Sequence, residues 1–133
     1  MKAVLMRVQR ASVTIDERET RSIGRGFLIL LAVTHDDTEA QAVKLADKLC
    51  SLRLFEDADG KINLTLDEVG GEIMIVSQFT LYGNCRKGRR PEFLSAARPE
   101  IAIPMYEKFV EICREKGYHV AVSYTHLRAH ETR

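Results

Sequence analysis

The chain has no long hydrophobic run and no strong excess of either charge. Its longest apolar stretch, Phe27–Val33, is much shorter than the roughly 18 residues that a membrane span requires. The opening residues reach a charge too early for a signal peptide, with lysine at position 2 and arginine at position 7. The formal net charge is only +1, so contact with nucleic acid would need a local basic patch rather than a general field. We therefore expect a protein that has no membrane partner.

Cysteines and cofactor motifs are also scarce. The three cysteines, Cys50, Cys85 and Cys113, are widely spaced and odd in number, which argues against a disulfide framework and favours the reducing cytoplasm. Gly24-Arg25-Gly26 lacks the third glycine of a dinucleotide fingerprint, and Asp57–Gly60 is typical of a turn rather than of a calcium loop. We expect no cofactor and no metal.

Short strand patterns outnumber helical patterns in this sequence. Residues alternate along Lys2–Arg10, whereas Phe27–Val33 is typical of a buried central strand. Thr38 and Gln41 have the spacing of a capping box and predict a helix start. A second helix is expected from about Ile103 to Lys116. The pattern predicts one α+β domain, with two main helices and a curled, largely antiparallel, barrel-like sheet whose strands are mostly connected by hairpin turns.

The most informative stretch is Ile73–Pro91. It starts as the apolar run Ile73–Val76, which is typical of a strand buried on both faces. It then changes abruptly to a polar and aromatic group, Ser77, Gln78, Phe79 and Thr80. Four cations follow at once: Arg86, Lys87, Arg89 and Arg90. A buried strand that delivers polar groups beside a cationic loop is suited to hold a phosphate-bearing substrate at a rigid site.

Plainer interpretations of both features stay open. The polar residues could be incidental to a strand end, and the cations could form a solvated loop that keeps an edge soluble. No Ser/His/Asp triad can be assembled, because His35 precedes two aspartates in a predicted loop and His119 lies in a predicted strand. A base-activated nucleophile is therefore not visible.

Five segments of the chain match the sequence of one known family: Arg7–Val13, Leu52–Asp57 with Gly60-Lys61, Ser77–Tyr82, Lys87–Pro91 and Tyr106–Phe109. Through them the chain resembles D-aminoacyl-tRNA deacylase from Met1 to about Ala121. Members of this family are homodimeric hydrolases that proofread aminoacyl-tRNA as part of translation quality control. The resemblance implies hydrolysis of the ester between a D-amino acid and the terminal ribose of tRNA, and also removal of glycine misplaced on alanine tRNA.

The resemblance also implies roles for individual residues. The catalytic pocket would be formed by Ser77–Thr80 and would hold the terminal adenosine and the D-amino acid, with the backbone N–H groups of Phe79 and Thr80 facing the developing oxyanion. Further substrate contacts are implied for Arg7, which would brace the pocket, and for the loop cations Arg86, Lys87 and Arg89. Either Thr80 attacks the ester as a nucleophile or the ribose 2′-hydroxyl of the tRNA assists. We favour the second mechanism, because the sequence offers no obvious base beside Thr80.

The end of the chain departs from the family. Members continue after the position of Ala121 with a Phe-Gly-Ala-Asp-Met-like segment and an Asn-x-Gly-Pro-Val-Thr motif, and neither is present here. We interpret residues 1–121 as the family domain, incomplete at its C-terminus, and residues 122–133 as a non-native, adaptor-like tail. The metal-like spacing of His126, His130 and Glu131 in that tail therefore carries no weight. Because the family's Gly-Pro segment excludes L-amino acids, we expect this chain to be weakly active or unselective.

Two other functions fit the same residues. A non-catalytic RNA-binding module would use the cationic loop to bind tRNA and would cleave no ester. A small esterase would cleave simple aryl esters, and replacement of Arg86 and Arg89 would not affect it. Hydrolysis of a D-aminoacyl-tRNA, compared with that of its L counterpart, separates the three functions.

Overall fold

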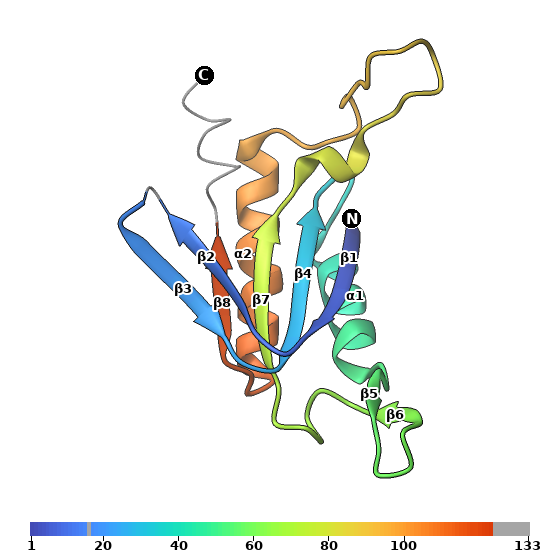
Figure 1. Cartoon of the computed structure of the whole chain (residues 1–133). Coiled ribbons are helices and arrows are strands. Elements are labelled where there is room, and N and C mark those ends of the chain that lie inside the picture. Colours follow the sequence, from blue (N-terminus) through green and yellow to red (C-terminus); the bar gives the residue numbers. More distant parts are fainter. Residues whose placement is uncertain (16, 124–133) are drawn as a thin grey trace.

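The computed structural model describes residues 1–15 and 17–123, whose arrangement is shown in Figure 1. In chain order the elements are β1 (Lys2–Val8), β2 (Ala11–Ile15), β3 (Glu19–Ile23), β4 (Gly26–Ala32), α1 (Glu39–Ser51), β5 (Phe55–Glu56), β6 (Ile62–Leu64), β7 (Glu72–Ser77), the 3-10 turn η1 (Phe79–Tyr82), α2 (Pro99–Glu115) and β8 (Val120–Ser123). The predicted α+β class with two main helices is confirmed.

The main sheet has four strands in the order β1-β4-β7-β8. Antiparallel pairing joins β1 to β4, β2 to β3 and β5 to β6, whereas the pairs β4–β7 and β7–β8 are parallel. Parallel neighbours need long crossover connections, and α1 and α2 each lie in one of them. The sequence pattern predicted mostly hairpin connections, so the parallel pairing at the centre of the sheet differs from that prediction. The sequence does carry a signal for parallel pairing: β4 and β7 are continuously apolar, which is typical of parallel strands covered on both faces.

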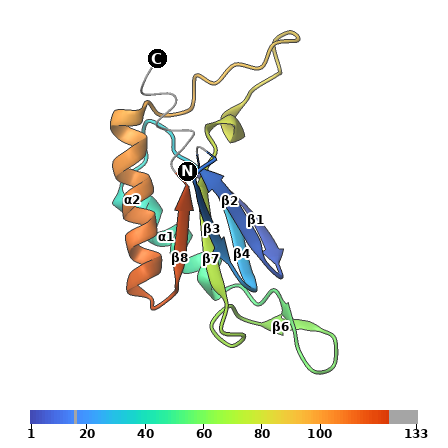
Figure 2. The same ribbon diagram turned by 60° about the vertical axis from the view of Figure 1, so that its left-hand side comes forward.

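Both helices pack on one face of this sheet and enclose the main core (Figures 1 and 2). Alternate residues of the central strands point into this core and are almost completely buried: Phe27, Ile29 and Leu31 on β4, and Ile73 and Ile75 on β7. The helices add further apolar side chains to the same cluster: Ala42, Ala46, Leu49, Phe109 and Val110. Removal of this apolar surface from water stabilises the fold and fixes the ends of β4 and β7.

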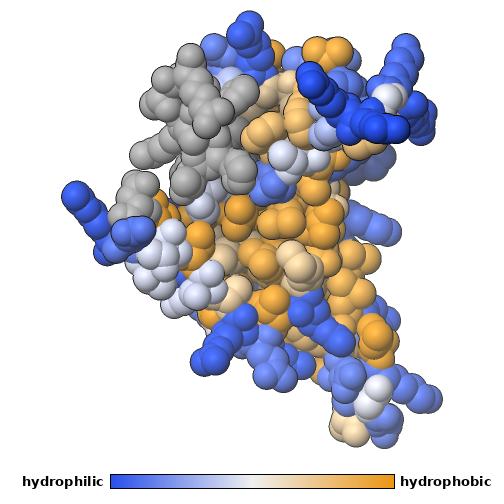
Figure 3. All heavy atoms as spheres, turned by 45° about the horizontal axis from the view of Figure 1, so that its top comes forward, coloured by the Kyte–Doolittle hydropathy of each residue, from blue (hydrophilic) through white to orange (hydrophobic). Residues whose placement is uncertain are grey.

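The hairpin β2–β3 lies across the opposite face of the sheet (Figure 1). Ile23 of β3 is buried against Met74 of β7 and Ala121 of β8. The part of this face formed by β1 stays open, since Val4 is 43% exposed and Met6 is 37% exposed. Figure 3 shows hydrophobic atoms gathered over the strands on this side. One half of this face is thus covered by the hairpin, and the apolar half on β1 is uncovered.

The residues at the start of each helix explain why the helix begins there. Gln41 Oε1 accepts a hydrogen bond from the Thr38 backbone N–H at 2.8 Å and another from the Thr38 hydroxyl, which confirms the predicted capping box. Helix α2 starts at Pro99, one turn earlier than the expected Ile103. Pro99 fits the first turn, where its missing N–H would have no partner, and Pro104 is accommodated inside the helix.

The segment Asp57–Gly60 forms the predicted turn. Asp57 Oδ1 accepts hydrogen bonds from the backbone N–H groups of Lys61 at 3.0 Å and Asp59 at 2.9 Å, and these bonds lower the pKa of the Asp57 carboxyl. Gly60 has a φ of 74°, in the left-handed region that glycine adopts without strain. The carboxylate of Asp57 is therefore engaged within its own turn.

Strand β8 ends the described part of the chain at Ser123. Val122 and Ser123, the first two residues of the predicted tail, are buried residues of this strand, and Ser123 pairs with Val76. The other tail residues, including the metal-like group His126, His130 and Glu131, lie outside the described residues. No helix in the described part of the chain has the length and apolar character needed to cross a membrane.

Candidate active site

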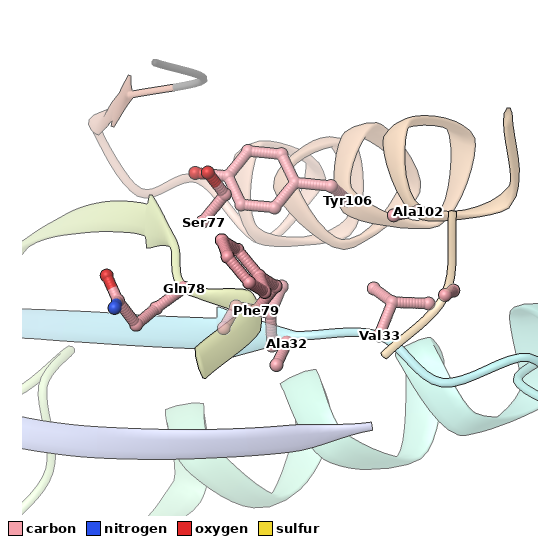
Figure 4. A pocket seen from close by; sticks show the side chains of 9 residues that line it. Ala32, Val33, Ser77, Gln78, Phe79, Ala102 and Tyr106 are labelled. Atoms are coloured by element: carbon pink, nitrogen blue, oxygen red, sulfur yellow. The ribbon is translucent and has the colours of Figure 1, made fainter. Parts of the chain in front are cut away.

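The ends of two parallel strands meet at one edge of the main sheet. Because β4 and β7 run in the same direction, Leu31 pairs with Ser77 and the chain leaves both strands at this edge. A small pocket lies just beyond it (Figure 4). Its lining residues are Leu31, Ala32, Val33, Ser77, Gln78, Phe79, Ala97, Ala102 and Tyr106. Sites at the carboxyl ends of parallel strands are common, because loops there are held by a rigid sheet.

Backbone hydrogen bonds hold three distant segments around this pocket. The Gln78 N–H donates to the Leu31 carbonyl at 2.8 Å, and the Ala97 N–H donates to the Val33 carbonyl at 2.8 Å. The space that this pocket offers to water-sized groups measures about 10 Å³, which is room for a single one. Any larger group must therefore lie on the rim, where Gln78 and Phe79 are half-buried and Thr80 is exposed.

Two hydroxyl groups belong to the walls of the pocket. The Tyr106 side chain is almost fully buried, and its hydroxyl donates to the Ile75 carbonyl at 2.6 Å, with the Ser123 carbonyl 3.0 Å away. This contact ties α2 to the interior of β7 and to the end of β8. Ser77 is only 2% exposed, and its Oγ has no hydrogen-bond partner among the described residues. A buried hydroxyl left unpaired costs about 1–3 kcal/mol, so the Ser77 hydroxyl is available to a bound group.

Thr80 has a donor, not a base, beside its hydroxyl. The side-chain amide of Gln78 donates a hydrogen bond to Thr80 Oγ1. A nucleophilic threonine needs an adjacent group that accepts its proton, and no Asp, Glu, His or Lys is among the nine residues that line the pocket. This geometry agrees with the preference for a mechanism in which Thr80 is not the nucleophile.

The backbone at the rim is better suited to catalysis than the side chains are. Phe79 and Thr80 are the first two residues of η1. The Thr80 N–H lies in the first turn, where a helix offers no acceptor of its own. Fixed N–H groups of this kind can stabilise the negative charge that develops on an ester oxygen during hydrolysis.

The predicted cationic loop projects from the same end of the molecule (Figures 1 and 2). Its neck is closed by two backbone hydrogen bonds between Asn84 and Glu92, of 2.8 and 2.9 Å. All four cations, Arg86, Lys87, Arg89 and Arg90, are exposed, and none forms an ion pair with a described residue. The loop therefore leaves the molecule at the same end as Ser77–Thr80 (Figures 1 and 2), and a joint role of the two in substrate binding stays a prediction.

Arg7 does not lie at this pocket. It pairs with Phe27 on β4, four residues before Leu31, which puts it about 13 Å from the pocket edge along the strand. Its Nη1 donates to the Leu54 carbonyl at 2.7 Å, and its side chain lines a separate open cleft with Gln9 and Arg25. Arg7 therefore does not brace the pocket of its own chain, because β1 runs antiparallel to β4 and β7.

Two aromatic residues of this region, Tyr106 and Phe93, were not predicted as site residues from the sequence. Tyr106 appeared only as part of a matching segment, although a tyrosine on the buried face of a helix usually has a hydrogen-bond partner. Phe93 follows the cationic run closely, and its ring packs edge-on to Phe79, with the centroids 5.5 Å apart and an interplanar angle of 70°. The sequence signal that could have identified Phe93 is an aromatic residue close to clustered cations.

Known proteins are similar to this chain over most of its length. The family model described as D-Tyr-tRNA(Tyr) deacylase matches residues 4–130. A D-aminoacyl-tRNA deacylase of Thermus aquaticus is 52% identical over 120 residues, which cover 90% of this chain and 79% of the relative. One of Thermotoga petrophila is 48% identical over 130 residues, which cover 98% of this chain and 86% of the relative.

Solved structures resemble the same fold. The c-Myc DNA Unwinding Element Binding Protein superposes with a TM-score of 0.83 at 38% identity, covering 92% of this chain and 83% of that protein. A probable eukaryotic D-amino acid tRNA deacylase superposes with a TM-score of 0.73, covering 85% of this chain and 66% of that one. Its identity of 21% supports the fold alone.

Proposed function

This chain belongs to the D-Tyr-tRNA(Tyr) deacylase family, and we propose that it is a tRNA-editing hydrolase. The proposed substrate is a D-aminoacyl-tRNA, whose ester is cleaved to free tRNA and the D-amino acid. Glycine mischarged on alanine tRNA is a second proposed substrate. The observation that carries the proposal is that Ser77, Gln78 and Phe79 line a pocket directly before an exposed loop, whose four cations form no ion pair with a described residue.

The proposed mechanism relies on position rather than on a protein nucleophile. The ester carbonyl lies at the rim, where the N–H groups of Phe79 and Thr80 donate to the oxygen that becomes negative as water attacks. The Thr80 hydroxyl stays bonded to Gln78, while the neighbouring 2′-hydroxyl of the ribose assists the attack. The bond between the acyl carbon and the ribose oxygen then breaks, and that oxygen takes up a proton.

The size of the pocket limits which part of the substrate enters it. A nucleoside does not fit into about 10 Å³, so the terminal adenosine rests on the rim and only a small group reaches Ser77. The phosphates of the preceding nucleotides then extend toward Arg86, Lys87 and Arg89, which lie beyond η1. Cations on a projecting loop can follow a nucleic-acid backbone without reading its sequence.

We propose a homodimer as the working form. The open face of the sheet exposes Val4 and Met6, and Leu28 and Leu30 beside them are half-buried. A contiguous exposed apolar surface of this kind is typical of an interface. Arg7 could act on a substrate only if a partner chain brought it to the pocket. Light scattering should give a molar mass twice that of one chain.

The proposed substrate places the protein in the cytoplasm, where aminoacyl-tRNAs are used. Cys50 and Cys113 are neighbouring free thiols between α1 and α2, which fits a reducing compartment. The hydrogen bond with Cys50, together with burial, raises the pKa of the Cys113 thiol, so this thiol stays protonated.

The direct test is deacylation of D-Tyr-tRNA and L-Tyr-tRNA by the purified chain. We expect release of D-tyrosine well above the uncatalysed rate. Binding of tRNA without hydrolysis would instead support the RNA-binding alternative, and turnover of aryl esters alone would support a general esterase. Hydrolysis of the L substrate tests the expectation that a chain without the Gly-Pro motif is unselective. A clean preference for the D substrate would contradict that expectation and leave the proposed activity intact.

A further inference from the structure

We propose that Phe93 is a stacking platform for a nucleobase of the unpaired RNA end, at the nucleotide that precedes the terminal adenosine. This inference rests on the proposed function, because it assumes that the pocket rim receives the end of a tRNA. It adds a binding residue outside the segment Ser77–Thr80 and outside the cationic loop.

Phe93 lies between the pocket and the cations. On one side its ring contacts Phe79, which lines the pocket, with ring centroids 5.5 Å apart. On the other side Phe93 directly follows Glu92, which closes the neck of the cationic loop by pairing with Asn84. A strand of RNA that leaves the rim toward Arg86 and Lys87 therefore passes Phe93.

The ring is exposed, yet its surroundings hold it in place. Phe93 is 36% exposed, and the next residue, Leu94, is 81% exposed. The Leu94 N–H donates to Glu92 Oε2 at 2.8 Å, and the Leu94 carbonyl lies 2.7 Å from His35 Nε2. Gly83 packs so closely that a Cβ there would be 3.0 Å from Phe93 Cε1. An aromatic ring fixed in this way loses little conformational entropy when a base stacks on it.

The neighbouring positive charges indicate that a nucleobase, rather than an apolar protein surface, stacks on the Phe93 ring. Proteins that bind single-stranded RNA combine a cationic path for the phosphates with aromatic rings for the bases. Here four exposed cations without ion partners among the described residues adjoin one exposed ring. The small volume of the pocket, about 10 Å³, also leaves the terminal nucleoside on the rim, beside this ring.

The binding test uses fluorescence and needs no catalysis. An uncharged tRNA carries 2-aminopurine in place of the base before the terminal adenosine, and stacking on Phe93 quenches its emission. We expect quenching with the wild-type chain and with Phe93→Trp, and loss of quenching with Phe93→Ala. The control is Ile62→Ala, which removes an apolar side chain that is 62% exposed on β6. Quenching that persists in Phe93→Ala would overturn the proposal.

The kinetic test compares two substrates, D-Tyr-tRNA and the short ester D-tyrosyl-adenosine, which has no preceding nucleotide. Phe93→Ala should lower kcat/KM for the tRNA by about tenfold more than for the short ester, the scale of one stacked base. Phe93→Trp should restore the tRNA activity and Phe93→Leu should not. Equal losses on both substrates, or full activity of Phe93→Leu, would overturn the inference while the proposed hydrolase function stood. If the wild-type chain cleaves neither substrate but still quenches the 2-aminopurine emission, the proposed hydrolase function is wrong and the stacking role of Phe93 is still supported.

Discussion

Replacement of Thr80 by proline should nearly abolish deacylation, whereas replacement by alanine should leave most of it. Thr80→Ala removes the hydroxyl and keeps the backbone N–H, so we expect a single-turnover rate within about tenfold of wild type. Thr80→Pro removes the hydroxyl and the N–H together. Loss of one oxyanion donor lowers kcat by about 10²–10³-fold. The measurement is single-turnover hydrolysis of D-Tyr-tRNA at saturating enzyme.

The position of Thr80 makes this pair of variants a fair comparison. Thr80 is the second residue of η1 and is exposed, and proline is tolerated in the first turn of a helix. The carbonyl of Thr80, which accepts from the Gly83 N–H at 2.9 Å, is kept in both variants. Circular dichroism and thermal unfolding check that the fold is unchanged. A loss of about 10³-fold in Thr80→Ala would assign Thr80 as the nucleophile, and an unimpaired Thr80→Pro would exclude its N–H as a donor.

Removal of the loop cations should make tRNA recognition almost independent of salt. If all four cations contact phosphates of a single strand, the slope of log affinity against log salt is about −2.8, because each contact contributes about 0.7. KM of the wild type for D-Tyr-tRNA should then rise by about 50-fold between about 50 and 200 mM salt. The variant replaces all four residues with glutamine: Arg86, Lys87, Arg89 and Arg90. Its KM should be high at low salt and change little as salt increases, with kcat at saturation preserved.

A second variant controls for the loss of net charge. It removes four exposed cations that lie on other parts of the surface, Arg10, Lys44, Lys48 and Lys61. Its net charge falls by the same amount, so a general electrostatic effect would change both variants equally. We expect the control to keep the salt dependence of wild type. Equal behaviour of the two variants, or a loop variant with normal KM, would show that the loop is only a solvated surface element.

Local patterns predicted the elements of this fold better than their pairing. The capping box of Thr38 and Gln41 and the turn at Asp57–Gly60 are set by neighbours in sequence, and both were predicted correctly. The direction in which β7 runs beside β4 depends on where a crossover helix packs, which no short segment encodes. The start of α2 was misplaced because Pro104 was given the first-turn position that Pro99 occupies.

The same limit applies to the candidate site. The change from Ile73–Val76 to Ser77–Thr80 marked the rim, because a strand end and its polar residues are continuous in sequence. Tyr106 reaches this region only through the packing of α2 on the sheet, where its hydroxyl meets the Ile75 carbonyl. Arg7 was expected beside the pocket, but its place follows from the antiparallel register that pairs it with Phe27. Residues that the topology brings together from distant parts of the chain cannot be placed from the sequence alone.

Hydrolysis without a titratable protein group is tested most directly by the pH dependence of the single-turnover rate on D-Tyr-tRNA. After subtraction of uncatalysed hydrolysis, the rate should change monotonically between about pH 5.5 and 8.5, because no side chain that titrates in this range lines the pocket. An inflection near about pH 6–7 that disappears when His35 is replaced would show that a protein acid or base takes part. That result would contradict catalysis by backbone amides and substrate assistance.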